Sequence, residues 1–208
     1  REAEKAKKEA AKADQLSEAT SMVERCNTNV TNILSDVSEV YDKTISGLIK
    51  EDRKTLKDQT RRVKEINKNT KALKDDIPVI ISKLKEDSIE TGPYYVHVLD
   101  YLRETAHCLT YITKPLFIHI DNNHKELITI HIKELDEVKD DVLILLNDIK
   151  ELLSRNEFNR VNDVIETQQT LLQKIANNRK LQMKRIKANE VGTKNSILYL
   201  SLINSNIL

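Results

Sequence analysis

The fold is decided by two glycine-led stretches, GPYYVHVLDYLRETAHCL at residues 92–109 and GTKNSILYLSLINSNIL at residues 192–208. Hydrophobic residues follow the glycine at matching offsets in both. The chain has only three glycines and three prolines, so its backbone has few reasons to leave a helix. A joint that is used twice predicts a helical bundle that is used twice.

The composition favours long helices with solvated outer faces. Of the 208 residues, 39% are hydrophobic and 32% are charged, and tryptophan is absent. Aromatic residues make up only 4%, so we expect an aliphatic core. This length is enough for one or two compact units.

Apolar residues at alternating spacings of three and four predict the first helix. Residues 1–15 are charged and alanine-rich, and we expect them to form a helical lead-in or linker. A long helix then runs from Leu16 to about Lys50. Its apolar stripe consists of Leu16, Ala19, Val23, Cys26, Val30, Ile33, Val37 and Val40.

Two further helices follow in the first half. Asp52 is expected to cap the second helix, and Pro78 lies inside its stripe, where we expect a kink rather than an end. Pro93 fits the first turn of the third helix, and Pro115 predicts a second kink. The two stripes are Leu56, Val63, Ile66, Leu73, Ile77, Ile80 and Leu84, then Val98, Leu102, Ala106, Leu109, Leu116 and Ile120.

The second half repeats this plan. Residues 121–123 are expected to close the third helix and cap the fourth, residues 154–156 form a turn, and Gly192 separates the fifth helix from the sixth. The fourth helix carries a near-perfect heptad stripe. The stripes are Ile128, Leu135, Val138, Val142, Leu145, Ile149 and Leu152, then Phe158, Val161, Ile165, Leu172, Ile175 and Ile186.

We therefore predict an all-α fold of six long antiparallel helices, arranged as two tandem three-helix bundles. The first bundle covers residues 16–121 and the second covers residues 122–208, because short joints force neighbouring helices to run antiparallel. The sequence begins at Arg1 rather than at a methionine, and it stops at Leu208 within an apolar helical pattern. We expect it to be part of a longer protein whose sixth helix is truncated here.

Charge and cysteine content narrow the function classes. A net charge of +1 disfavours nucleic-acid binding, which needs a basic excess. The basic run around Arg61 and Arg62 is interpreted as a solvated helix face. Cys26 and Cys108 are expected to be free thiols in a reducing compartment, with Cys26 in the core. No apolar run reaches the length of a membrane span, so we expect no lipid insertion by this segment.

A metal site is one hypothesis for the third helix. His97, Asp100, Glu104 and His107 are spaced to line one helix face, and carboxylates with imidazoles can bind iron or zinc. A salt-bridged, solvated face with no metal is the competing interpretation. His119, His124 and His131 are interpreted as structural. The sequence shows no nucleophile with a matching base and no phosphate-binding glycine loop, so we expect no enzymatic activity.

The run VLDYLRETAHCL, followed by the break near Asn122 and a long heptad helix, resembles the PhoU-like domain. More closely, residues 16–208 resemble the cytoplasmic C-terminal part of bacterial sodium/phosphate cotransporters. The resemblance implies a pair of three-helix bundles and a role in phosphate transport or its regulation. It also implies an iron or zinc cluster that is bound by acidic motifs. Only Asp100 and Glu104 match such a motif here, so any site is degenerate. We therefore expect either no cofactor or one divalent metal.

The leading hypothesis is a non-enzymatic regulatory domain on the cytoplasmic face of the bacterial inner membrane. Its expected partners are the transmembrane part of the same transporter or a second copy of the chain. Two alternatives stay open. A coiled-coil or spectrin-like scaffold without a link to transport explains the regular heptads, and a ferritin-like metal-binding bundle explains the carboxylates and histidines.

Overall fold

The computed structural model describes residues 2–82, 90 and 92–206, with side chains from Glu24 onward. In this part of the chain the fold is all-α and contains no strand, which confirms the predicted fold class. The helices are α1 (Glu2–Ile49), α2 (Arg53–Asp75), α3 (Ile77–Ile81), α4 (Gly92–Asp121), α5 (Thr129–Arg155), α6 (Val161–Lys187) and α7 (Thr193–Ser205), and a 3-10 turn, η2 (Phe158–Arg160), precedes α6.

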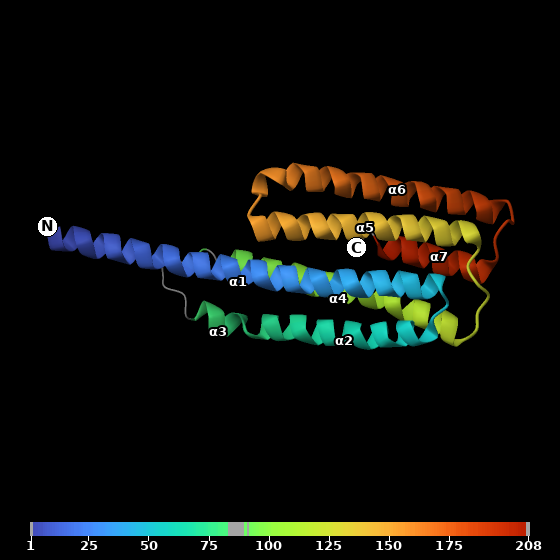
Figure 1. The fold of residues 1–208 in the computed structure, drawn as a ribbon, viewed down its shortest axis with the longest axis horizontal. Coiled ribbons are helices and arrows are strands. Elements are labelled where there is room, and N and C mark those ends of the chain that lie inside the picture. The colour runs from blue at the N-terminus through green and yellow to red at the C-terminus, as the bar shows by residue number, and fades with distance from the viewer. Residues whose placement is uncertain (1, 83–89, 91, 207–208) are drawn as a thin grey trace.

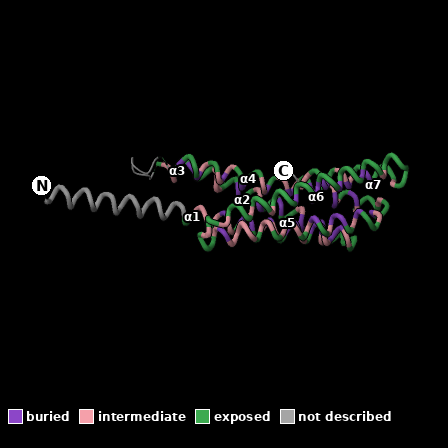
Figure 2. Tube along the Cα trace, turned by 90° about the horizontal axis from the view of Figure 1, so that it is seen from above, coloured by how far each residue is buried: buried purple, intermediate pink, exposed green. Residues whose placement is uncertain are grey.

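The long helices lie side by side in one elongated bundle (Figure 1). The helix α1 packs against α2 and α4 in the first half of the chain and against α5 in the second half. In turn α6 packs on α5, and α7 lies against α6 and α4. These contacts are compatible with two tandem trios. The buried apolar residues of both halves nevertheless form one cluster along the inner sides of the helices (Figure 2).

The predicted helix starts at Asp52, Gly92 and Gly192 are confirmed. The Asp52 carboxylate accepts hydrogen bonds from the Thr55 N–H at 3.0 Å and from the Thr55 hydroxyl at 2.7 Å. Gly192 is the extended residue before α7, and Gly92 opens α4. The two glycine-led helices bury matching positions, the third, seventh and tenth after each glycine: Tyr95, Leu99 and Leu102, then Asn195, Tyr199 and Leu202.

Three helix ends use asparagine where glycine would be usual. Asn123, Asn156 and Asn189 follow α4, α5 and α6 with φ values of 49°, 55° and 57°. Asparagine tolerates this left-handed conformation, which satisfies the last carbonyl groups of a helix. The scarcity of glycine therefore does not prevent sharp helix ends.

Two predicted boundaries are wrong. The second helix does not continue through Pro78 with a kink. Instead α2 ends at Asp75, and Pro78 lies in the first turn of the separate helix α3, where a missing N–H is tolerated. Residues 121–123 close α4 but do not cap the next helix. The residue before α5 is Ile128, so a loop of several residues connects the two halves. Leu84, assigned to the second stripe, lies outside the described residues.

Candidate functional site

The predicted metal residues lie on the outer side of α4. Asp100 accepts a hydrogen bond from the Lys74 ammonium at 2.5 Å, and this bond holds the pKa of the Asp100 carboxyl below its ordinary value. Glu104 and His97 are exposed, and the His107 ring lies 3.3 Å from the Tyr111 hydroxyl. Among the side chains that the structure describes, no three His, Cys, Asp or Glu residues are grouped to hold a metal. Iron or zinc binding at Asp100 and Glu104 stays a prediction.

A buried polar network joins α5, α6 and α7. The Arg185 guanidinium donates to both carboxylate oxygens of Glu134, at 3.0 and 2.5 Å. The Tyr199 hydroxyl donates to the same carboxylate. The His131 ring is fully buried, and it stacks on the Tyr199 ring with centroids 4.2 Å apart. Gln182 completes the network, because its side-chain oxygen accepts from Arg185 at 3.2 Å and lies 2.8 Å from His131 Nε2.

The hydrogen bonds fix the protonation of His131. The Gln182 oxygen can only accept, so His131 Nε2 carries a proton and, in the neutral ring, Nδ1 carries none. Burial, followed by the nearby Arg185 charge, lowers the pKa of His131. Burial and the bond to Glu134 raise the pKa of Tyr199. The network therefore contains one positive charge, on Arg185, and one negative charge, on Glu134, and its other side chains are neutral. It joins α5, α6 and α7 and does not face solvent.

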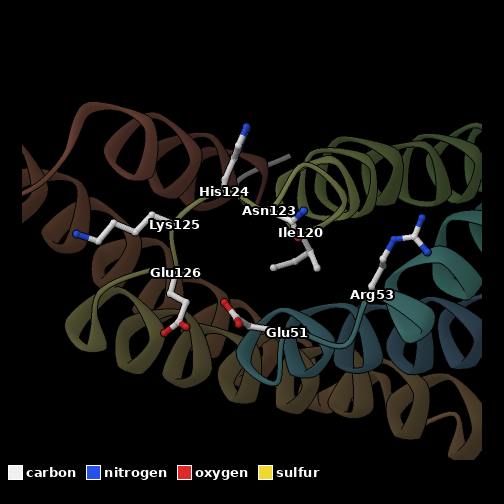
Figure 3. Close-up of a pocket in the computed structure, with 7 residues that line it drawn as sticks. All are labelled: Glu51, Arg53, Ile120, Asn123, His124, Lys125 and Glu126. Carbon is white, nitrogen blue, oxygen red and sulfur yellow. The ribbon is translucent and has the colours of Figure 1, made fainter.

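An open pocket of about 620 Å³ lies where the α1–α2 turn meets the loop after α4 (Figure 3). It is lined by Glu51, Arg53, Ile120, Asn123, His124, Lys125 and Glu126. Arg53, His124 and Lys125 point in different directions. The Arg53 guanidinium is already bound to Asp121 at 2.5 Å. The lining mixes both signs of charge, and its cations do not converge on one point.

His119 lies close to this pocket and is a core residue. Its ring is 4% exposed and meets the His124 ring edge to face, with centroids 5.3 Å apart. Burial, followed by the neighbouring His124, lowers the pKa of His119. His119 is therefore part of the interior, and the structural roles expected for His124 and His131 stay predictions.

Part of the apolar stripe of α6 is exposed. Four residues of α6 that this stripe assigned to the core are exposed, with Val161 at 40%, Ile165 at 41%, Leu172 at 38% and Ile186 at 39%. Val142, Leu145 and Ile149 of α5 are half-buried and pack against the core cluster. We call Val161, Ile165 and Leu172, which lie on one side of α6, the α5/α6 face. The apolar stripe predicted for the fifth helix is therefore buried only in part.

The two cysteines are free and half-buried. Cys26 packs against the core cluster, as predicted, but it is not fully enclosed. Burial raises the pKa of both thiols. The basic run on α2 is an exposed helix face, in which Arg62 pairs with Asp36 and Arg61 with Asp58.

Comparisons of the chain with family models, with curated proteins and with solved structures find no match. Within the described part of the chain, no helix is both long and apolar enough to cross a membrane. The resemblance to PhoU-like domains therefore rests on the residues quoted for it.

Sequence reasoning missed the Glu134–Arg185 pair, because 51 residues separate its members. One signal was present. On α6, Gln182 lies seven residues after Ile175, at a position where the apolar stripe requires a core residue. On α5, His131 lies seven residues before Val138 and also occupies a core position. Polar residues at core positions of two neighbouring helices indicate that they bond to each other.

Proposed function

We propose that the protein is a non-catalytic helical interaction domain that docks another protein on the α5/α6 face. The observation that supports this proposal is the exposure of Val161, Ile165 and Leu172 along one side of α6. Contiguous exposed apolar residues mark interaction sites in proteins that otherwise bury such side chains. The polar network around Glu134 is turned inward and serves the packing of the domain itself.

Other features of the molecule suit a docking role. The helix α1 is 48 residues long and packs against helices of both halves. A partner held on α5 and α6 is therefore connected to the first half through α1. Such a domain regulates a partner only if it binds one state of that partner better than another.

The finer proposal concerns the identity of the partner. The resemblance of the run VLDYLRETAHCL to PhoU-like domains supports a sodium-dependent phosphate transporter, regulated from the cytoplasmic face of the bacterial inner membrane. The partner is then the transmembrane part of that transporter. This assignment depends on the resemblance, whereas the docking role depends on the exposed face.

Site-specific photo-crosslinking in the source cells tests both the docking role and the identity of the partner. A photoreactive side chain at position 165 is expected to give one reproducible protein adduct, identified by mass spectrometry. The same group at position 144 gives none, because Ile144 is exposed on another side of α5. Equal adducts at both positions, or none at 165, contradict the docking role. An adduct that is not a membrane transporter contradicts only the finer proposal.

A further inference from the structure

Six cations follow one side of α2. They are spaced alternately three and four residues apart, which is the period of a single helix face. All six are exposed. At 1.5 Å per residue they extend over about 26 Å, so they form one continuous line of positive charge. We call this set the α2 basic row, and its members are Lys54, Lys57, Arg61, Lys64, Lys68 and Lys71.

The α2 basic row lies opposite the side of α2 that faces the core. Each of its first five members precedes a buried residue by two positions, as Lys54 precedes Leu56. Two residues turn a helix by about 200°, which brings the next side chain to the far side. The buried side of α2 belongs to a helix that packs against α1 and α4. The row therefore points away from the bundle, along the edge that α2 forms in Figure 1.

The positive charge of the row is not neutralised locally. Asp58 and Glu65 are the acidic residues within its length, and they pair with Arg61 and Arg62. Among the side chains that the structure describes, none forms an ion pair with the five lysines of the row. The helix α2 contains nine basic and three acidic residues, whereas the chain contains 34 and 33. The rest of the molecule is therefore net acidic, and the excess of positive charge is concentrated on α2.

The row offers no anchor for a protein partner. No aromatic residue occurs in α2, and its large apolar residues Leu56, Val63 and Ile66 are buried in the core. Protein interfaces are depleted in lysine, and their binding energy comes from buried aromatic and arginine side chains. A row of exposed lysines on a convex helix therefore fits a polyanionic surface better than it fits another protein.

The geometry favours a bilayer over a nucleic acid. Proteins that hold single strands stack the bases on aromatic side chains, which α2 lacks. Proteins that hold a duplex carry a clear basic excess, whereas the net charge of this chain is +1. A straight helix with flexible lysines along one side matches a flat layer of anionic headgroups, which attracts each cation that lies within a Debye length of it.

We infer that α2 is a membrane-surface element whose basic row holds the domain on bilayers rich in anionic phospholipid without inserting into them. The inference goes beyond the proposed docking role and concerns another side of the molecule. In Figure 1, α2 and α6 lie along opposite edges of the bundle, so the α5/α6 face is turned towards water when α2 lies on a bilayer. A transmembrane partner would then reach that face through loops that extend into water.

Co-sedimentation of the whole chain with lipid vesicles tests the inference. Vesicles of phosphatidylcholine with about 30% phosphatidylglycerol should bind the protein at low salt, and vesicles of phosphatidylcholine alone should not. Because the attraction is electrostatic, raising the salt from about 0.05 M to about 0.5 M should release the bound protein. Equal binding to both kinds of vesicle, binding that resists salt, or no binding to the anionic vesicles overturns the inference.

Two double variants locate the contact. Lys57→Gln with Lys64→Gln removes two charges from the row and should weaken vesicle binding about 25-fold, or about fivefold for each charge. Lys180→Gln with Lys184→Gln removes the same charge from exposed positions of α6 and should leave binding unchanged. Circular dichroism checks that both proteins are folded. An equal loss in the two variants would show that total charge, and not the row, attracts the protein, and this result also overturns the inference.

A DNA duplex of random sequence tests the competing polyanion. Duplex binding at a salt concentration that abolishes vesicle binding, weakened by Lys57→Gln with Lys64→Gln, would assign the row to nucleic acid and overturn the inference. The crosslinking experiment at position 165 is independent of these results. Loss of vesicle binding leaves a position-165 adduct and the docking role intact, while vesicle binding without that adduct contradicts the docking role alone.

Discussion

Arg185 and Glu134 form a two-pronged ion pair between α6 and α5, with donor–acceptor distances of 3.0 and 2.5 Å. Only 14% of the Arg185 side chain and 9% of the Glu134 side chain are exposed. A pair shielded in this way is costly to break, because the remaining charge stays buried without its partner.

Glu134→Leu is expected to lower the free energy of unfolding by about 3 kcal/mol, since it leaves the Arg185 charge unpaired. The double variant Glu134→Leu with Arg185→Leu should recover most of that loss, because no isolated charge remains. Urea unfolding of the four proteins in this cycle measures the coupling. Glu39→Gln removes the exposed pair with Lys43 and should cost under about 0.5 kcal/mol. Additive effects of the two leucine substitutions would show that the pair does not couple the helices.

Stability should fall with acidification near the ordinary pKa of histidine. The pKa values of His131 and His119 are lowered in the folded protein, so the unfolded chain binds more protons as the pH drops. The contribution of these residues is complete above the unfolded pKa of about 6.5 and is lost as the pH falls through their folded values. Unfolding curves between pH 7.5 and pH 5 measure this loss.

His131→Asn removes one of the two titrating groups and should flatten the pH dependence, whatever it does to stability at neutral pH. His107→Asn changes an exposed imidazole and is the matched control. A pH dependence of unfolding that is the same in all three proteins would rule out the buried ring as its source.

Both thiols should react slowly in the folded protein. Cys26 and Cys108 are half-buried, and burial raises the pKa of each, so few thiolates are present at pH 7.5. Labelling by a thiol reagent should accelerate several-fold in urea, and mass spectrometry assigns the rate to each cysteine. Folded and unfolded protein labelled at one rate would contradict the packing of Cys26 against the core.

Metal analysis of the purified protein decides whether Asp100 is a metal ligand or part of a salt-bridged, solvated helix face. Because the Lys74 ammonium binds the Asp100 carboxylate, we expect less than about one iron or zinc ion per ten chains. Lys74→Ala frees the Asp100 carboxylate, so this variant should take up metal more readily than the unchanged protein. Stoichiometric metal in the untreated protein, lost on Asp100→Ala, would establish the site that the sequence suggests.

The helices themselves could be predicted from local signals. Asp52 and Gly192 begin helices because a carboxylate cap and an extended glycine act over a few residues. Boundaries with two competing signals were harder to predict. Pro78 is compatible with a kink or a start, and Asn123 proved to terminate one helix without initiating the next.

Burial was less predictable than helix formation. The apolar stripe placed Ile165 and Leu172 in a core, because their spacing is that of packed residues. Whether such a stripe is covered depends on which helices pack against it, and no local pattern in α6 records its neighbours. The same limit explains why Glu134 and Arg185 were not paired in advance.

The polar network also determines how α5 and α6 are aligned along their axes. Apolar heptads look nearly alike after a slide of seven residues, so aliphatic packing alone leaves neighbouring alignments close in energy. A slide of one heptad would separate Glu134 from Arg185 and leave two shielded charges without each other. The pair therefore favours one register of α5 on α6, and the side chains that the domain presents to a partner stand at fixed heights along the bundle.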